Sequence, residues 1–322
     1  MMGLQKELSI PQLSTATAVT IGVFDGVHLG HQHLLRSVVH AAKERGLSPV
    51  VVTFLNHPRS VLRPADPIRW LTSLDDRVVL LKAAGVEHVV PITFTRDFSL
   101  LTAEEFTLAL RDSLRMAHMV VGPNFAMGYQ RQGTFPMLQE LGHTHSFTVE
   151  QATPLEFSGR RINSTGVREA LGVGDVEKVT SYLGRYFHVA GEVEHGEGRG
   201  GSELGFPTVN LHLEESQALP ADGVYAAQAV VDGKRYTAAA SVGTKPTFHI
   251  DGRLTVEAFL LDYTGDLYDR QVRLEFIKRL RPQEQFGTPE ALAAQMHRDV
   301  EEVTEVMRSL TPIDNTMPSQ SG

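Results

Sequence analysis

The fold is decided by the stretch Ile21-Gly-Val-Phe-Asp-Gly-Val-His-Leu-Gly-His31, which joins the first valine-rich run of the chain to the first amphipathic segment. Residues 19–24 have the apolar character of a buried strand. Residues 31–44 place leucine, valine and alanine at helical spacing, and Gly46 follows where a left-handed helix cap belongs. A strand that passes directly into a helix predicts an α/β domain.

Similar strand and helix patterns continue as far as about Leu183. The strands are expected at residues 19–24, 50–54, 88–94, 119–122 and 147–150. Capping boxes formed by Ser73 with Asp76 and by Thr102 with Glu105 mark two more helix starts, because the cap hydroxyl and the later carboxylate each bind an orphan backbone amide. The pattern predicts a mostly parallel, buried sheet with helices on both faces.

After about Arg185 the pattern changes to short alternating segments separated by turn residues such as Asp232-Gly233. These segments are residues 223–231, 234–242, 254–261 and 272–277. They predict a small antiparallel β-barrel or sandwich, closed by one helix that Thr288-Pro289 opens. The expected domains are therefore residues 1–185 and 186–310, followed by a disordered polar tail at residues 311–322.

The composition of the 322 residues excludes several classes of function. The net charge of -8 disfavours a general nucleic-acid-binding surface, and the absence of cysteine excludes disulfides and thiolate catalysis. No stretch approaches the roughly 18 apolar residues of a membrane helix, and the first residues have no signal-peptide core. We expect a cytoplasmic protein that binds neither nucleic acid nor membranes.

The histidines His28 and His31 bracket Gly30 in an HxGH pattern at the expected helix start. A helix N-terminus offers free amides to phosphate, glycine allows close approach, and two imidazoles reach the same phosphates. Such a site can promote attack of one phosphate on the α-phosphorus of ATP by positioning alone. Two histidines near a helix start can also be ordinary cap residues, but the strand-to-helix junction is where doubly wound sheets bind ligands.

A second candidate phosphate site is the segment with Ser164, Thr165 and Arg168. Ser-Thr before a helix can be an ordinary N-cap, but together with the HxGH pattern it predicts a clamp for the β- and γ-phosphates. Residues 53–58 and 122–128 each place an aromatic ring near polar groups after a strand, which suits a flat heteroaromatic substrate. For Phe125, a core position and a stacking position are equally compatible with the sequence.

The second half of the chain has a glycine-rich turn at residues 197–210 that could wrap phosphate but is not a Walker loop. Glu257 is an acidic residue inside an apolar strand pattern, where it must point out of the core or have a partner. From the residues alone, a solvent-facing glutamate is the commoner case.

The chain resembles the prokaryotic bifunctional riboflavin kinase/FMN adenylyltransferase family in three motifs that occur in order. These are Gly22-Val-Phe-Asp-Gly-Val-His-Leu-Gly-His31, Asn163-Ser-Thr-Gly-Val-Arg168 and Leu204-Gly-Phe-Pro-Thr-Val-Asn210. The resemblance implies an N-terminal Rossmann-like nucleotidyltransferase domain that makes FAD and pyrophosphate from FMN and ATP. It also implies a C-terminal barrel, a riboflavin kinase domain, that makes FMN from riboflavin and ATP.

The resemblance also implies roles for individual residues. It makes His28, His31 and Arg168 catalytic for adenylyl transfer, and Glu257 the base that takes the proton of the ribityl 5'-hydroxyl. In the transferase it assigns ATP to Gly22, Phe24, Asp25, Gly26, Gly30, Ser164 and Thr165. There it assigns the flavin to Phe54, His57, Pro58, Asn124 and Phe125. In the kinase it assigns ATP to Gly205, Phe206 and Pro207, and Mg²⁺ to Thr208 and Asn210.

The chain departs from the family pattern at Asn56, where proline is frequent, and at Asn163, where a serine is usual. Lys245 and Asp269 replace a common arginine and a common glycine, and the glycine-rich turn is one residue longer. Lysine keeps the charge but loses bidentate geometry. We expect these departures to affect loop shape and nucleotide affinity more than the type of reaction.

Three other functions compete with this interpretation. The chain could be an adenylyltransferase for another mononucleotide or a pantetheine phosphate, with a non-catalytic barrel. An aminoacyl-tRNA synthetase also uses HxGH but needs a Lys-Met-Ser-Lys-Ser loop, which this chain lacks. A regulatory module with inactive sites is disfavoured by the retained motif residues. The leading prediction has riboflavin, FMN, FAD and ATP with Mg²⁺ as partners, in a monomer or weak homo-oligomer.

Overall fold

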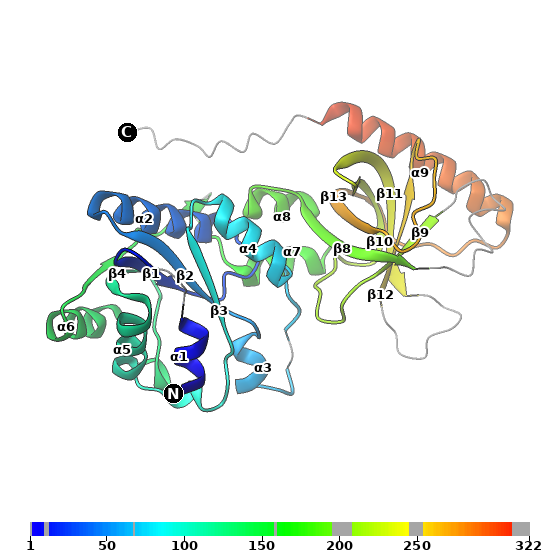
Figure 1. The fold of residues 1–322 in the computed structure, drawn as a ribbon. Helices are drawn as coiled ribbons and strands as arrows, with labels where there is room; N and C mark the ends of the chain where they lie inside the picture. Colours follow the sequence, from blue (N-terminus) through cyan, green and yellow to red (C-terminus); the bar gives the residue numbers. More distant parts are fainter. Residues whose placement is uncertain are drawn as a thin grey trace. The chain divides into compact units, whose positions relative to one another are not determined.

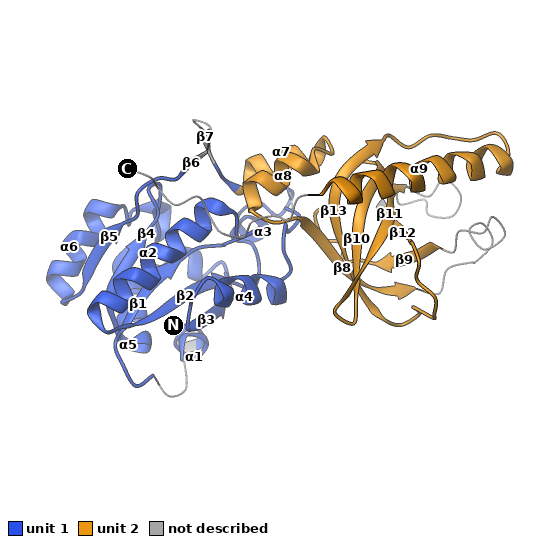
Figure 2. Ribbon diagram, turned by 90° about the horizontal axis from the view of Figure 1, so that it is seen from above, with its two compact units in different colours: residues 1–163 blue, residues 164–322 orange. Residues whose placement is uncertain are grey.

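The computed structural model describes residues 2–9, 13–66, 68–157, 160–194, 208–244 and 254–310. It divides into two compact units, Met1–Asn163 and Ser164–Gly322 (Figure 2), and each unit is described by itself. The predicted disordered tail and the candidate residues Gly205, Phe206, Pro207 and Lys245 lie outside the described residues. No helix in the described ranges is long and apolar enough to cross a membrane.

The first unit is built on a parallel five-stranded sheet in the order β3-β2-β1-β4-β5 (Figure 1). Its strands are β1 (Thr17–Ile21), β2 (Ser48–Phe54), β3 (His88–Ile92), β4 (Met116–Val121) and β5 (Thr148–Gln151). The predicted Rossmann-like α/β fold is confirmed. The order reverses beside β1, between β2 and β4, so the loops after β1 and β4 border the crevice where such sheets bind ligands.

Helices cover both faces of this sheet, as its all-parallel order requires. They are α1 (Met2–Leu8), α2 (Leu29–Arg45), α3 (Pro58–Leu62), α4 (Leu74–Ala83), α5 (Ala103–Leu114) and α6 (Phe135–His145). Short 3-10 turns occupy η1 (Phe98–Leu100) and η2 (Tyr129–Arg131), and β6 (Glu156–Phe157) pairs with β7 (Arg160–Arg161). Figure 1 places α1 and α5 on one face and α2 and α4 on the other.

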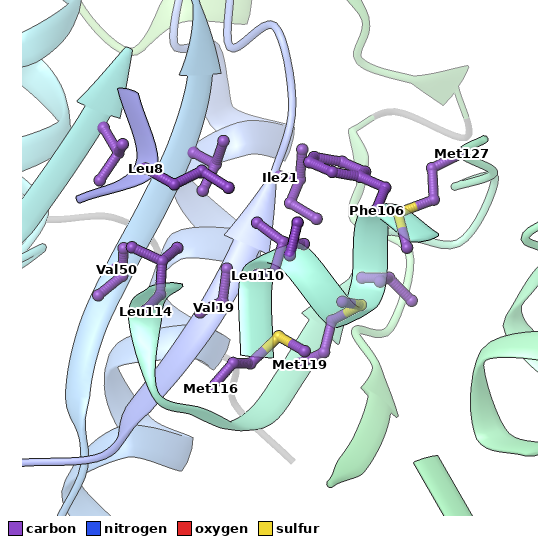
Figure 3. Close-up of a cluster of buried hydrophobic side chains, with 14 of the residues drawn as sticks. Leu8, Val19, Ile21, Val50, Phe106, Leu110, Leu114, Met116, Met119 and Met127 are labelled. Carbon is purple, nitrogen blue, oxygen red and sulfur yellow. The ribbon is translucent and has the colours of Figure 1, made fainter. Parts of the chain in front are cut away.

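The core on the α1 and α5 face joins residues far apart in the sequence (Figure 3). Leu8 from α1, Val19 from β1 and Leu110 from α5 are each fully buried there. On the opposite face, Leu35 from α2 and Leu81 from α4 pack in one cluster with Val51. The strand positions are therefore apolar on both sides, which explains why they occur as continuous valine runs in the sequence.

Most of the predicted helix signals in this unit are confirmed. Gly46 caps α2 with a φ of 64°, and Thr102 forms a complete capping box with Glu105. Ser73 caps α4 by accepting a hydrogen bond from the Asp76 amide, and the Asp76 carboxylate accepts from the Ser73 hydroxyl. The first strand ends at Ile21, earlier than predicted, because the following residues form a tight turn.

The second unit is a closed barrel in the order β10-β11-β12-β9-β8-β13, and all the strand pairs are antiparallel. Its strands are β8 (Phe187–Glu194), β9 (Thr208–His212), β10 (Gly223–Val231), β11 (Lys234–Thr244), β12 (Leu254–Leu260) and β13 (Gln271–Arg281). The terminal helix α9 (Pro289–Ser309) begins with Thr288 as its N-cap and Pro289 in its first turn. The predicted barrel and terminal helix are confirmed.

Two helices, α7 (Ser164–Gly172) and α8 (Val176–Leu183), belong to the second unit although they precede its barrel in the chain. Arg279 on β13 donates a hydrogen bond to the Val173 carbonyl, and the Ala221 amide donates to the Leu171 carbonyl. The compact units divide between Asn163 and Ser164, whereas the sequence pattern changes near residue 185, where β8 begins. The change of pattern near residue 185 thus marks the step from α8 to the first barrel strand, β8.

Candidate active sites

The loop between β1 and α2 holds the HxGH histidines at the start of a helix. His28 is the N-cap of α2, and its Nδ1 accepts a hydrogen bond from the His31 amide at 3.2 Å. The two imidazole rings stack with centroids 3.6 Å apart and planes inclined by 17°. The ring of Phe24 meets His31 edge-on at 5.2 Å. Both histidines therefore lie beside the orphan amides that make a helix N-terminus an anion site.

The environment of His31 keeps its ring neutral. Burial lowers the pKa of His31 well below its usual value, and the nearby charges of His28 and Arg77 lower it further. Within the described residues, the buried Nδ1 of His31 makes no hydrogen bond. A buried ring nitrogen without a protein partner is suited to a ligand group that the chain itself does not supply.

Glycine is required where the loop approaches other groups. A Cβ on Gly30 would lie 3.2 Å from the His28 ring and 3.2 Å from the Ile162 carbonyl. A Cβ on Gly22 would lie 3.0 Å from the Phe24 ring, and Gly26 has a φ of 81°. Asp25 is buried, and its carboxylate accepts hydrogen bonds from the Leu71 and Thr72 amides. The shape of this loop therefore depends on Gly22, Gly26 and Gly30, which are also predicted to bind nucleotide. The Asp25 carboxylate instead binds backbone amides of the protein.

The departure at Asn56 has a structural reason. Its side-chain amide donates to the Phe94 carbonyl at 2.8 Å, and its oxygen accepts from the Phe94 amide at 2.8 Å. This pair joins the loops after β2 and β3, a function that proline cannot perform. His57 caps α3 by accepting from the Arg59 amide, Pro58 opens that helix, and the His57 ring meets Trp70 edge-on. Hydrogen bonds that involve the side chains of Asn56 and His57 therefore hold the loop after β2 in place.

A cavity of about 310 Å³ lies near the candidate flavin residues of this unit. It is lined by Leu62, Phe94, Arg96, Phe98, Ser99, Leu100, Leu101, Phe106, Gly128, Tyr129, Gln130 and Arg131. Phe54 is 7% exposed in the core, and its ring meets Phe94 and Phe98, which line the cavity. Phe125 packs partly buried on the same core, and Arg131 donates to the Asn124 carbonyl.

Sequence reasoning missed the aromatic and arginine residues of this cavity. Phe94 and Phe98 follow β3 along the chain, and Tyr129 and Arg131 follow the loop with Asn124. The signal was present, because aromatic residues recur at or after the ends of β2, β3 and β4. The distances across those strands were not available from the sequence.

Ser164, Thr165 and Arg168 lie on α7, at the start of the second unit. The Arg168 guanidinium donates to the Ser164 carbonyl one turn earlier at 3.2 Å. Ser164 and Thr165, expected ahead of the helix, are its first two residues, and the predicted phosphate clamp remains a prediction.

The second candidate site is a cavity of about 270 Å³ between the barrel wall and α9. Thr208 and Glu257 line it, together with Ser241 and Arg281. Asn210 stands directly opposite Glu257 across the β9 and β12 pair, and Ser241 stands opposite it across β11. Residues directly opposite on antiparallel strands share a face, so Glu257 points with Asn210 away from the barrel core, whose side is formed by its buried neighbours Val256 and Ala258.

The wall of this cavity is tied to α9 by a buried ion pair. The guanidinium of Arg281 donates to both carboxylate oxygens of Asp299, at 2.9 and 2.7 Å. This hydrogen-bonded carboxylate raises the pKa of Arg281. Gln283 donates to the Ser241 hydroxyl at 2.7 Å. Sequence reasoning identified none of these contacts, because they join β13 to α9 and the segment after β13 to β11.

The departure at Asp269 also has a local reason. Asp269 has a φ of 60°, in the left-handed region that glycine adopts without strain. Aspartate is among the few other residues that tolerate it. The turn before β13 is therefore kept without the glycine that is common in the family.

Comparison with known proteins identifies both units. The family model for FAD synthetase matches residues 10–166, and the family model for riboflavin kinase matches residues 183–307. A bifunctional riboflavin kinase/FMN adenylyltransferase from Pseudomonas fluorescens is 38% identical over 87% of this chain and 90% of its own length. The protein of that name from Bacillus subtilis is 32% identical over 94% of this chain and 96% of its own.

A solved structure from Streptococcus pneumoniae, named a macrolide-efflux protein, matches with a TM-score of 0.85 and 31% identity. The match covers 95% of this chain and 97% of the solved chain. Its name describes a different activity, so it supports the fold of the whole chain and carries no functional argument. From the two family models and the curated relatives together, the chain belongs to the bifunctional riboflavin kinase/FMN adenylyltransferase family.

Proposed function

We propose that the chain phosphorylates riboflavin to FMN in its second unit and adenylylates FMN to FAD in its first. The proposal rests chiefly on the order of the two family matches, each of which falls on a unit with its own candidate site. The alternative of another adenylyltransferase with a non-catalytic barrel is not supported, because the riboflavin kinase model matches the barrel.

In adenylyl transfer, a phosphate oxygen of FMN attacks the α-phosphorus of ATP, and the bond to the β-phosphate oxygen breaks to release pyrophosphate. No protein nucleophile is needed, because positioning and charge stabilisation supply the rate. The amides at the start of α2 and the rings of His28 and His31 hold the phosphates. The resemblance assigns the rest of the phosphate clamp to Ser164, Thr165 and Arg168.

The flavin of this first site is held by the loops with Phe54, His57, Pro58, Asn124 and Phe125. The aromatic cavity of about 310 Å³ supports this assignment, because a flat ring system gains from stacking on aromatic side chains. Phe54 contributes by fixing Phe94 and Phe98, because its own ring is buried.

In the kinase reaction, the ribityl 5'-hydroxyl attacks the γ-phosphorus of ATP, and the bond to the departing ADP oxygen breaks. Glu257 takes the proton of that hydroxyl. Its position supports this role, because it lines the cavity and stands opposite Asn210. The family resemblance assigns the binding of ATP in this reaction to Gly205, Phe206 and Pro207.

Both reactions use ATP, and enzymes of this kind need a divalent metal. Thr208 and Asn210 fit Mg²⁺, because both offer neutral oxygen ligands on the strand face beside Glu257. Among the described residues no group of three or more histidine or acidic side chains could hold a metal alone. When bound, Mg²⁺ neutralises charge on the phosphates.

The experiment that tests the function incubates the full chain with riboflavin and MgATP and separates the flavins by chromatography. FMN followed by FAD is the expected result, and FMN with MgATP alone yields FAD. Absence of FMN contradicts the kinase, and absence of FAD from supplied FMN contradicts the transferase. Size-exclusion chromatography checks the proposed monomer or weak homo-oligomer. Separate expression of residues 1–185 and 186–310 checks the proposed domain boundary, and cell fractionation checks the proposed cytoplasmic location.

A further inference from the structure

Arg77 on α4 is among the largest side chains buried in this unit, with 1% of the residue exposed. Its Nη1 donates to the Val23 carbonyl at 2.8 Å and to the Thr53 hydroxyl at 3.4 Å. The guanidinium carbon lies 4.3 Å from the ring centroid of Trp70. One side chain thus touches the loop after β1, the end of β2 and the aromatic residue beside His57.

Burying this charge is costly to the fold. Burial lowers the pKa of Arg77 to about 10, and the Asp25 carboxylate offsets part of that effect. Within the described residues, its buried Nε makes no hydrogen bond. Arginine is rarely buried without full pairing, and an apolar residue of the same volume would avoid the desolvation. A buried arginine that is only partly paired therefore calls for a reason beyond stability.

The loop that Arg77 contacts has a strained backbone. Phe24 has a φ of 50° and Val27 a φ of 37°, in the left-handed region that side chains other than glycine rarely adopt. Such strain persists only where the surroundings hold it. Arg77 holds the Val23 carbonyl on one side of this turn. On the other side, the Gly26 amide donates to the Thr72 hydroxyl at 3.1 Å.

Residues 71–77 therefore contact the loop between β1 and α2 and hold its backbone in place. Asp25 accepts hydrogen bonds from the Leu71 and Thr72 amides, and its charge faces that of Arg77. The strained turn leads directly into His28, the N-cap whose ring stacks on His31. A shift in the position of the Val23 carbonyl would therefore move the stacked rings of His28 and His31 together with the first amides of α2.

We propose that Arg77 is a positioning residue for adenylyl transfer, which fixes the strained turn behind the HxGH loop and does not touch the nucleotide. This inference rests on the proposed adenylyl-transfer function of the first unit. Arg77 acts through the Val23 carbonyl and Asp25, and its charge also contributes to the field at His31. The other charged group that faces His31 is His28.

The test compares Arg77→Met, Arg77→Lys and a matched core variant, Leu110→Ala. Leu110 is fully buried on the opposite face of the same sheet and lines neither candidate cavity. FAD formation from FMN is measured for kcat and KM against pH, and riboflavin kinase activity is measured in the same preparations. Unfolding is followed by the fluorescence of Trp70, the only tryptophan in the sequence.

Arg77→Met should lower the kcat of FAD formation about 100-fold, because a misplacement of about 1 Å can cost that much, with a smaller change in KM. Arg77→Lys keeps the charge but loses the planar fork, so it should recover part of this loss and remain about tenfold below the wild type. Removing the charge should also move the acidic limb of kcat/KM to higher pH, because the pKa of His31 rises. Leu110→Ala should lower stability and leave kcat and the pH profile unchanged.

The inference is overturned if folded Arg77→Met keeps the wild-type kcat and pH profile, or changes them only as Leu110→Ala does. If Arg77→Met does not fold, Arg77→Lys decides, and a wild-type kcat in that variant overturns the inference. Kinase activity should be unchanged in all three variants. A wild-type chain that makes no FAD would instead contradict the proposed function, so the two failures are distinguishable.

Discussion

His28 and His31 stack ring on ring, 3.6 Å between centroids, at the first turn of the helix that follows the first strand. Two imidazolium rings so close would repel each other, and the charge of His28 contributes to the lowered pKa of His31. The protonated form of one ring is thus disfavoured, and both residues lie at the same helix end. A triphosphate placed there meets hydrogen-bond donors held in position before it binds.

Replacing either histidine should separate the two activities. His28→Ala and His31→Ala should each lower FAD formation by 100-fold or more, the order of magnitude for a donor that stabilises transition-state charge. FMN formation should stay at the wild-type level, because the kinase site is in the other unit. Chromatography of the flavins from each variant measures both activities, and a parallel loss of both would contradict the assignment of the histidines to one site.

The stability of the first unit should fall in mild acid. The pKa values of His31 and His118 are lowered in the folded protein, mainly by burial. Protons therefore bind the unfolded chain first, so the stabilisation is complete above pH about 6.5 and is lost as the pH falls below it. Each histidine should add a slope of at most about 1.4 kcal/mol per pH unit.

Urea unfolding followed by Trp70 fluorescence at pH values from about 5.5 to 7.5 measures this slope. His118→Gln should flatten this dependence of stability on pH, because it removes one of the two buried histidines. His118 lies away from the HxGH loop and bonds the Thr148 hydroxyl on β5. A slope that is unchanged in this variant, or stability that rises in acid, would refute the assignment.

Glu257→Gln should remove riboflavin phosphorylation selectively. The amide keeps the shape of the side chain but cannot take a proton, and general bases typically contribute about 100-fold or more. The kcat of FMN formation should fall by that factor with little change in the KM for riboflavin. FAD formation from supplied FMN provides the internal control. Wild-type kinase activity in this variant would exclude Glu257 as the base.

Asp299→Ala should loosen α9 from the barrel. Both side chains of its ion pair with Arg281 are largely buried, so removing one leaves a charge without its partner and should cost about 3 kcal/mol. Kinase activity should fall, because Arg281 and Asp299 line the cavity. Arg270→Met is the matched control, since its ion pair with Asp232 is exposed and should cost less than about 1 kcal/mol. Calorimetry of the second unit's transition distinguishes the two variants.

Gly128→Ala should destabilise the first unit. Gly128 has a φ of 75°, and a Cβ would lie 2.5 Å from the Ala103 nitrogen. Strain and overlap together should cost about 2 kcal/mol or more. Gly3→Ala is the control in the same unit: a Cβ there meets nothing within 4 Å, and the change should stabilise α1 by up to about 1 kcal/mol. Urea unfolding by Trp70 fluorescence compares them, and equal effects would contradict this reason.

Local signals in the sequence predicted much of the fold. The helix α2 was predicted over residues 31–44 with Gly46 as its cap, and it is found at Leu29–Arg45, because caps and apolar spacing act within a few residues. The hairpin of β10 and β11 was predicted because Asp232-Gly233 and alternation act locally as well. The strand β8 was not among the predicted segments. The glycine-rich turn was predicted to lead into a strand at Thr208 and Asn210, but the partners of this strand, β8 and the more distant β12, could not be read from the sequence.

The sequence by itself determined the fold class, the two-domain order and the motifs His28 to His31 and Thr208 to Asn210. Each of these depends on patterns among residues that are close together in the chain. Only the tertiary structure decided which distant side chains support them. Arg77 lies 54 positions from the Val23 carbonyl that it binds, and Asp299 lies 18 from Arg281. Such contacts depend on how strands and helices pack, and no periodicity or spacing encodes them.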